Sequence, residues 1–196
     1  MLYNKFNLAV AKFAADEGRE EFKCVLFTKD KTVATDGVRL LEVSVNSALK
    51  VEDFPQVNGL AAMRGCSPFL VGAKQVTDLK LKGAKGLPIT EMVALKHVDN
   101  ERVEFLTTDL ESSQVKQMRR VDGKFPDYEQ IFPKDDPVAE VSVNGVKMAE
   151  LLKVIGEMGD ATGTVCIRFY GANKPIELRV QGVNQQARGM MMPMRE

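Results

Sequence analysis

The sequence predicts an α+β fold made of helix-plus-strands half-units, with antiparallel sheets that carry helices on one face. Three observations support this prediction: three segments have apolar residues at helical spacing, each is followed by about three short apolar segments, and turn residues separate those segments. The 196 residues are enough for one large domain or two small ones. Apolar residues at 44% and charged residues at 28% are typical of a folded chain.

The first half-unit is expected to begin with a helix from Asn4 to Asp16, which Gly18 can end. Its apolar stripe is formed by residues at helical spacing, namely Phe6, Val10, Phe13 and Ala14. Three strands are expected after the helix, at Phe22–Thr28, Thr32–Thr35 and Arg39–Val45. The stretch Lys50–Pro68 contains prolines and glycines without a clear period, so we interpret it as a loop that crosses to the next half-unit.

The second half-unit repeats this pattern. It is expected to contain a short strand, a helix and three further strands, at Phe69–Val71, Ala73–Leu81, Met92–Val98, Arg102–Thr107 and Ser113–Val121. The segment Val121–Pro137 has three prolines between bulky apolar residues, which favours a linker held against a surface. Residues 1–122 are therefore predicted to form a complete domain and residues 123–137 the interdomain linker.

The third half-unit is expected to form a partial domain over residues 138–196. Its predicted elements are again a strand, a helix and three strands, at Ala139–Val143, Val146–Met158, Thr164–Tyr170, Pro175–Gln181 and Gln186–Met192. The three half-units share this order of elements but no obvious sequence identity.

Composition excludes several function classes. The formal net charge of zero excludes a protein that is basic over its whole surface, although a local basic surface remains open. No apolar run is long enough to span a bilayer, and the first residues are too charged for a secretory signal, so a cytoplasmic protein is expected. Cys24, Cys66 and Cys166 have no metal-ligand spacing and are interpreted as core or near-core thiols. His97 lies in an expected strand outside any catalytic motif, so neither an enzyme nor a cofactor is predicted.

Three motifs stand out in combination: ATDGVRLLEV (Ala34–Val43), VDGKFPDYEQIFPK (Val121–Lys134) and MMMPMR (Met190–Arg195). In this order and at this spacing, the chain resembles the bacterial DNA polymerase III β sliding clamp. The resemblance covers nearly the whole chain and implies the clamp's middle domain followed by the last half of its final domain. It also implies a replication processivity factor. The alternative is an interaction adaptor or competitor that does not encircle DNA.

The resemblance further implies a pocket between the middle and last domains, in which short peptides of polymerases and repair proteins bind. The matching residues are Phe22, Thr35, Gly37, Val38, Arg39, Leu40, Pro126, Gln130, Ile131, Met190, Met191, Met192 and Met194. An extended peptide needs an apolar trough and a few polar groups, and flexible methionines suit several partners. Strand alternation predicts that Met191 points to the core if Met190 and Met192 face the peptide. The alternative is that these residues only join two domains.

Double-stranded DNA is a further partner that the resemblance implies, bound through phosphates without sequence preference. The candidate residues are lysines on or near the three helices, namely Lys5, Lys12, Lys74, Lys82, Lys85 and Lys147. The alternative is that these lysines only keep exposed helix faces solvated. A ring of this family contains twelve half-units, so four chains with three each would supply them, and a homo-oligomer is expected.

Overall fold

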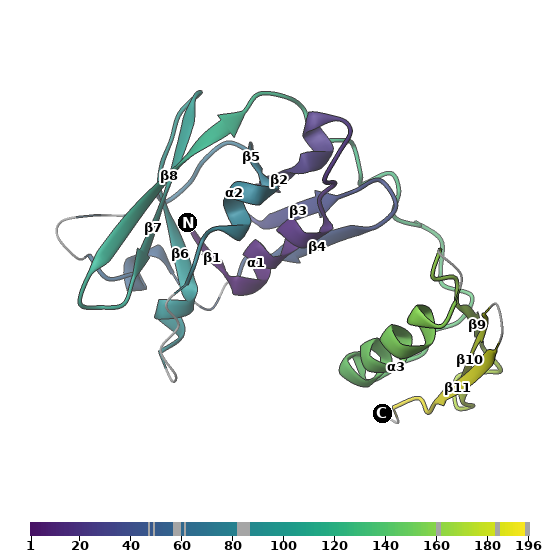
Figure 1. Ribbon diagram of the computed structural model, residues 1–196. Helices are drawn as coiled ribbons and strands as arrows, with labels where there is room; N and C mark the ends of the chain where they lie inside the picture. The colour runs from purple at the N-terminus through teal and green to yellow at the C-terminus, as the bar shows by residue number, and fades with distance from the viewer. Residues whose placement is uncertain are drawn as a thin grey trace. The chain divides into compact units, whose positions relative to one another are not determined.

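The computed structural model describes residues 1–46, 48, 50–56, 60, 62–81, 87–159, 162–182 and 185–194. The chain divides into two compact units, Met1–Tyr128 and Glu129–Glu196, which we call unit 1 and unit 2 and describe separately (Figure 1). Among the described residues, no helix has the length and apolar content that crossing a bilayer requires.

Unit 1 is built on an eight-stranded antiparallel sheet in the order β1-β6-β7-β8-β5-β2-β3-β4. The strands are β1 (Leu2–Asn4), β2 (Cys24–Phe27), β3 (Lys31–Thr35), β4 (Leu40–Ser44), β5 (Phe69–Gly72), β6 (Met92–Val98), β7 (Arg102–Thr108) and β8 (Ser113–Val121). The helices α1 (Lys5–Ala9) and α2 (Ala73–Thr77) lie on one face of this curled sheet (Figure 1). Short 3-10 helices occupy η1 (Val10–Phe13), η2 (Glu20–Lys23), η3 (Val51–Asp53) and η5 (Pro88–Glu91).

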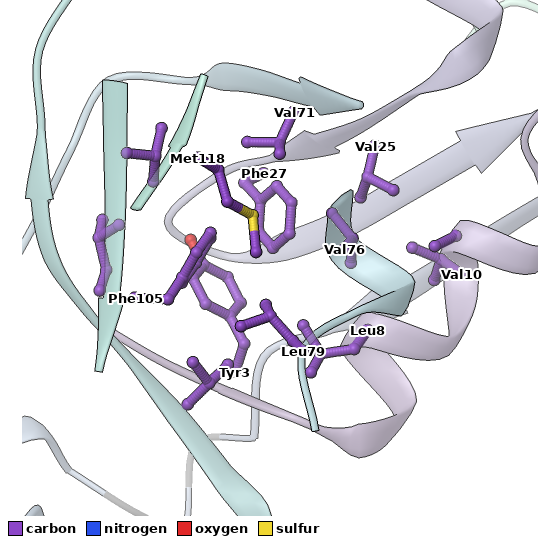
Figure 2. Close-up of a cluster of buried hydrophobic side chains, with 14 of the residues drawn as sticks. Tyr3, Leu8, Val10, Val25, Phe27, Val71, Val76, Leu79, Phe105 and Met118 are labelled. Carbon is purple, nitrogen blue, oxygen red and sulfur yellow. The ribbon is translucent and has the colours of Figure 1, made fainter. Parts of the chain in front are cut away.

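The core of unit 1 lies between this sheet and the helices (Figure 2). The Phe27 ring stacks on Phe69 with centroids 5.2 Å apart and meets the edge of Tyr3 at 5.1 Å. Helix residues such as Val10 and Val76 close the same cluster. Every second residue of a strand faces the helices, so the two half-units of unit 1 contribute to one continuous core.

Unit 2 contains α3 (Gly145–Glu157) and a three-stranded sheet in the order β11-β10-β9. Its strands are β9 (Cys166–Arg168), β10 (Ile176–Gln181) and β11 (Gln186–Met191). Ile176, Leu178 and Val180 alternate along β10 and pack against Ile155 of α3. Gly189 allows α3 to lie close to β11, because a Cβ there would stand 2.7 Å from Cδ1 of Ile155.

Most predicted strands are confirmed in their positions, and the helix expected at Val146–Met158 is confirmed as α3 (Gly145–Glu157), but the first two helices differ. The first helix is α-helical only over Lys5–Ala9 and tightens into the 3-10 helix η1 up to Phe13. The predicted stripe was wrong at Phe6, which is exposed, whereas Leu8 and Ala11 are buried. The 3-10 geometry changes the angle per residue, so helical spacing over the whole segment misplaces these side chains. The second helix ends at Thr77 rather than near Leu81.

Two further predictions were wrong in unit 2. The segment expected as a strand at Ala139–Val143 is not a strand, and the strand expected at Thr164–Tyr170 is reduced to Cys166–Arg168. Cys166 is exposed on β9 rather than in a core, while Cys24 is buried and Cys66 is partly buried. Both errors have one cause, since strand pairing and burial depend on neighbouring segments that the local pattern does not contain.

The first part of the predicted linker packs on unit 1. Phe125 and Tyr128 are buried in a cluster with Leu70. The Tyr128 hydroxyl donates to Glu42 at 2.8 Å, and Lys31 forms an ion pair with the same carboxylate at 2.8 Å. These contacts hold the chain against unit 1 as far as Tyr128, where the boundary between the two units lies.

Candidate functional site

The TDG turn of unit 1 connects β3 to β4 and is held by its own side chains. Thr35 Oγ1 donates to the Arg39 carbonyl at 2.8 Å and accepts the Gly37 N–H at 3.0 Å. Asp36 Oδ1 accepts the N–H groups of Arg39 and Val38, each at 2.9 Å. These hydrogen bonds lower the pKa of Asp36 to about 2, and the largest contribution comes from the Arg39 N–H. Gly37 has φ +90°, a conformation that favours glycine.

The turn points its three apolar or cationic residues in different directions. Val38 is 96% exposed, which makes it an apolar contact offered to solvent. Leu40 is half-buried and packs against the cluster of Val33 and Leu70. Arg39 pairs with Asp36 and lies over the Phe13 ring at 5.0 Å, so its side chain extends toward η1. Of these three residues, Val38 is therefore the one whose apolar side chain faces solvent.

Phe22 does not occupy the strand position that the resemblance implies. It lies in the 3-10 helix η2 before β2, half-buried, and its carbonyl accepts the Ala15 N–H at 2.9 Å. Pro126 is half-buried beside Phe125 on unit 1. Gln130 and Ile131 belong to unit 2 and are both exposed. The candidate set is therefore divided between the two units.

The methionines of unit 2 lie at the end of β11 and in the tail after it. Met190 and Met192 are 66% and 54% exposed, Met194 is exposed, and Met191 is half-buried opposite Ile176, as strand alternation predicts. The Met194 N–H donates to the Ser142 carbonyl at 2.8 Å and holds the tail beside the segment that precedes α3. The methionines line a hollow of about 480 Å³ together with Asn144, Lys147 and Leu151.

A second hollow of about 460 Å³ in unit 2 is lined by Met190 and by polar residues that the sequence prediction missed. The buried Glu177 carboxylate accepts the Tyr170 hydroxyl at 2.6 Å and Arg179 Nη2 at 2.9 Å, and it also pairs with Arg188. These hydrogen bonds lower the pKa of Glu177 to about 2, and the largest contribution comes from the Tyr170 hydroxyl. The sequence did contain a signal for this site, namely a glutamate between apolar residues in the IELRV segment. A charged side chain that is buried in a strand needs partners of opposite charge or hydrogen-bond donors.

The lysines singled out in the sequence have different surroundings. Lys5 forms an ion pair with Glu91 at 2.8 Å. Lys12 and Lys74 line one hollow of about 440 Å³ on unit 1, together with Lys23 and Arg39. Lys147 lines the methionine hollow instead. Lys82 and Lys85 lie outside the described residues. The structure thus gathers four cations at one hollow, two of which the sequence did not indicate for this role.

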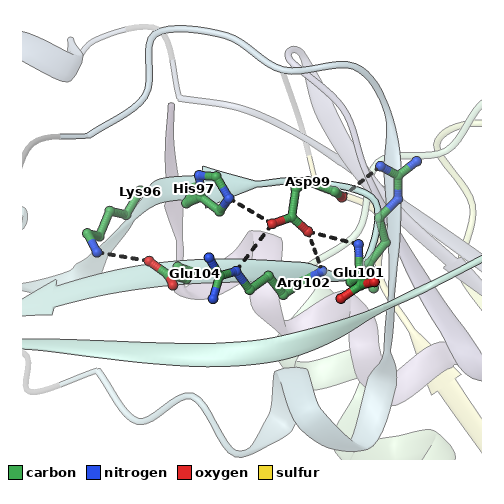
Figure 3. Close-up of polar contacts among 7 residues, drawn as sticks. Lys96, His97, Asp99, Glu101, Arg102 and Glu104 are labelled. Atoms are coloured by element: carbon green, nitrogen blue, oxygen red, sulfur yellow. Dashed lines mark hydrogen bonds and ion pairs between the residues drawn. The ribbon is translucent and has the colours of Figure 1, made fainter.

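His97 belongs to a polar network at the β6–β7 hairpin (Figure 3). Its Nε2 lies 2.9 Å from Asp99 Oδ2, while Asp99 Oδ1 accepts the backbone N–H groups of Glu101 and Arg102, each at 2.8 Å. The hydrogen bond to His97 and these backbone bonds lower the pKa of Asp99. Asp99 thus organises the hairpin turn. In the part of the chain that the structure describes, no three His, Cys, Asp or Glu residues are grouped as metal ligands.

Comparison with known proteins gives no matching family model and no matching curated protein sequence. The fold, however, matches solved structures over essentially the whole chain. A DNA polymerase III β chain from Streptococcus pneumoniae is 14% identical, with a TM-score of 0.68 over 100% of this chain and 49% of that one. Sliding clamps from Pseudomonas aeruginosa (14% identity, TM-score 0.64, 100% and 51% covered) and C. crescentus (17%, 0.65, 98% and 50%) match similarly. The chain therefore spans about half the length of these structures.

Proposed function

Because the chain has the fold of the bacterial DNA sliding clamps, we propose that it is a non-enzymatic replication or repair accessory protein that binds short peptides of its client proteins. The exposed thioether surface around Met190 and Met192 supports this proposal most strongly. A folded chain that exposes a group of flexible apolar side chains, beside a hollow of about 480 Å³, offers a binding surface. We further propose that Val38 of unit 1, which is 96% exposed, offers an apolar contact of its own to a client peptide.

The surroundings of the methionines suit an extended peptide. Apolar anchors of the peptide would contact the thioethers, and the exposed Arg188 guanidinium beside Met190, which pairs with the buried Glu177, offers a cation to its polar groups. Phe22 and Leu40 have no part in this proposal, because both are half-buried in unit 1. Affinity on the order of micromolar is expected, since a few anchors dominate such interfaces.

Peptide binding is tested first at Val38. The peptide is a fluorescently labelled segment from a bacterial polymerase that carries its clamp-binding motif, titrated with the purified full chain. We expect Val38→Asp to weaken binding at least about tenfold, because an anchor contributes about 2 kcal/mol or more. Val38 is 96% exposed, so the substitution leaves the core of unit 1 intact. Val115→Asp, on β8 of the same unit, is the control, and an equal effect of both substitutions would contradict a role for Val38.

Contact with double-stranded DNA is a second proposed property. It rests on Lys12 and Lys74 at the hollow of unit 1, since Lys23 and Arg39 there pair with Glu20 and Asp36. Such a surface would bind phosphates without reading sequence. We expect a labelled duplex to bind weakly, with affinity that falls steeply as salt rises and falls further in Lys12→Gln/Lys74→Gln. A protein that binds the peptide but no duplex at low salt would instead be an adaptor that does not encircle DNA.

A further inference from the structure

The two half-units of unit 1 are joined by exchanging strands. The strand before each helix pairs with the first strand after the helix of the other half-unit: β1 pairs with β6, and β5 pairs with β2, both antiparallel. In these pairs Tyr3 lies opposite Val93, and Val71 lies opposite Val25. All four side chains are in the core of unit 1. The core of each half-unit is therefore completed by the strand that precedes the helix of the other half-unit.

The corresponding segment of unit 2 lacks this pairing. Residues 139–143 precede α3 as β1 precedes α1, and Asn144 caps α3 as Asn4 caps α1. Val141 and Val143 are partly buried against the α3 core. The Met194 N–H bonds to Ser142 on one side, as β8 pairs with β5 in unit 1. The other side of the segment has no partner strand among the described residues, and no strand forms there.

The strand β9 of unit 2 lacks the complementary neighbour. It lies at the end of the described sheet, and its residues are all exposed, whereas most residues of β2 and β6 are buried. Ile167 pairs with Leu178, so it faces the same side of the sheet as the α3 core, yet it is 41% exposed. Phe169, two residues on, is also exposed. Apolar residues on a free strand edge favour association.

We infer that unit 2 associates with unit 2 of a second copy of the chain, each copy placing its residues 139–143 antiparallel against β9 of the other. The pairing seen in unit 1 fixes the register: Val143 would lie opposite Ile167, and Val141 opposite Phe169. Each copy supplies both edges, so the contact is self-complementary and closes as a two-fold dimer. Alternation places Glu140 and Arg168 together on the opposite face, where their charges are complementary.

A second copy fits this surface better than an unrelated protein for a reason within the chain itself. Unit 1 already contains two half-units joined in this way around one core. Unit 2 contains the two equivalent edges, one side of residues 139–143 and the outer edge of β9, and neither has a partner strand among the described residues. The inference does not rest on peptide binding, because it concerns β9 and residues 139–143 rather than the methionines of β11.

The test is the mass of the purified full chain by light scattering across the micromolar range. We expect a mass of two chains for the wild type and of one chain for Ile167→Lys, since a lysine would enter the shared apolar core. Val115→Lys is the matched control, because Val115 is 40% exposed on unit 1 against 41% for Ile167, and it should stay dimeric. Circular dichroism checks that each variant is folded.

Hydrogen exchange locates the contact. We expect amides of residues 139–143 and 166–169 to gain protection as the wild-type concentration rises, and to lose it in Ile167→Lys or in Phe169→Lys. A wild type that stays monomeric throughout, or a dimer that survives both lysine substitutions, would overturn the inference. Peptide titration of the monomeric variant is a separate measurement, so loss of the dimer and loss of peptide binding are distinguishable.

Discussion

The double substitution Met190→Asp/Met192→Asp is expected to abolish binding of the client peptide. The two side chains are 66% and 54% exposed and line the same hollow, so both are available as anchors. An anchor contributes about 2 kcal/mol or more, so losing both would weaken binding by roughly three orders of magnitude. Two carboxylates would also place charge where apolar peptide side chains must be buried. Binding on the order of micromolar would then fall below detection in a fluorescence titration.

The matched control for the methionines is Val146→Asp/Val154→Asp on α3. These valines belong to the same unit and are 71% and 61% exposed, so the change in charge and in exposed apolar surface is similar. We expect this variant to bind the peptide like the wild type. Equal loss in both double variants would show that added negative charge, rather than the thioether surface, controls the affinity, and would exclude the methionines as anchors.

Unit 2 is expected to lose stability in acid through Glu177. The bonds from Tyr170, Arg179 and Arg188 hold the pKa of this carboxyl at about 2, below its ordinary value of 4.5. A carboxyl whose pKa is lower in the folded state binds fewer protons there than in the unfolded state over that interval. The stabilisation is therefore complete above pH 4.5 and is lost as pH falls from 4.5 toward 2.

Comparing the wild type with Glu177→Gln isolates this contribution. The amide cannot balance the positive charge of Arg179 and Arg188, so we expect a lower Tm for the variant at neutral pH. The difference in Tm should shrink as pH falls from 4.5 toward 2, because the wild-type carboxyl then also becomes neutral. Thermal melts followed by circular dichroism measure it, with Glu150→Gln as a control at an exposed glutamate of α3. A difference that does not change with pH would contradict this role.

The local pattern of apolar and turn residues was sufficient to predict most strands of unit 1. The strand predicted at Met92–Val98 agrees in both bounds, and so does the one at Ser113–Val121. Turn residues flank both segments, so the local sequence contains the signals for where each strand begins and ends. The Asp99 turn between β6 and β7 is likewise set by bonds among near neighbours in the chain.

The site was harder to predict, because its polar residues depend on packing between distant segments. The sequence shows Glu177 as a charge between apolar residues, but its partners Tyr170 and Arg188 come from the β9–β10 connection and from β11. Phe22 was placed on a strand from its apolar neighbours, but a 3-10 helix precedes β2 there. Leu40 and Val38 belong to one motif, yet only tertiary contacts make one half-buried and leave the other exposed.

The sequence by itself determined the α+β class, the three half-units and the order of the helices and strands, because apolar periodicity and turn residues act over a few neighbouring positions. Only the tertiary structure decided which edges are paired. Residues 139–143 have the same apolar alternation as a strand, but a strand also needs a partner for its N–H and C=O groups. In unit 1 such partners come from the other half-unit, and in unit 2 the described residues supply them on one side only.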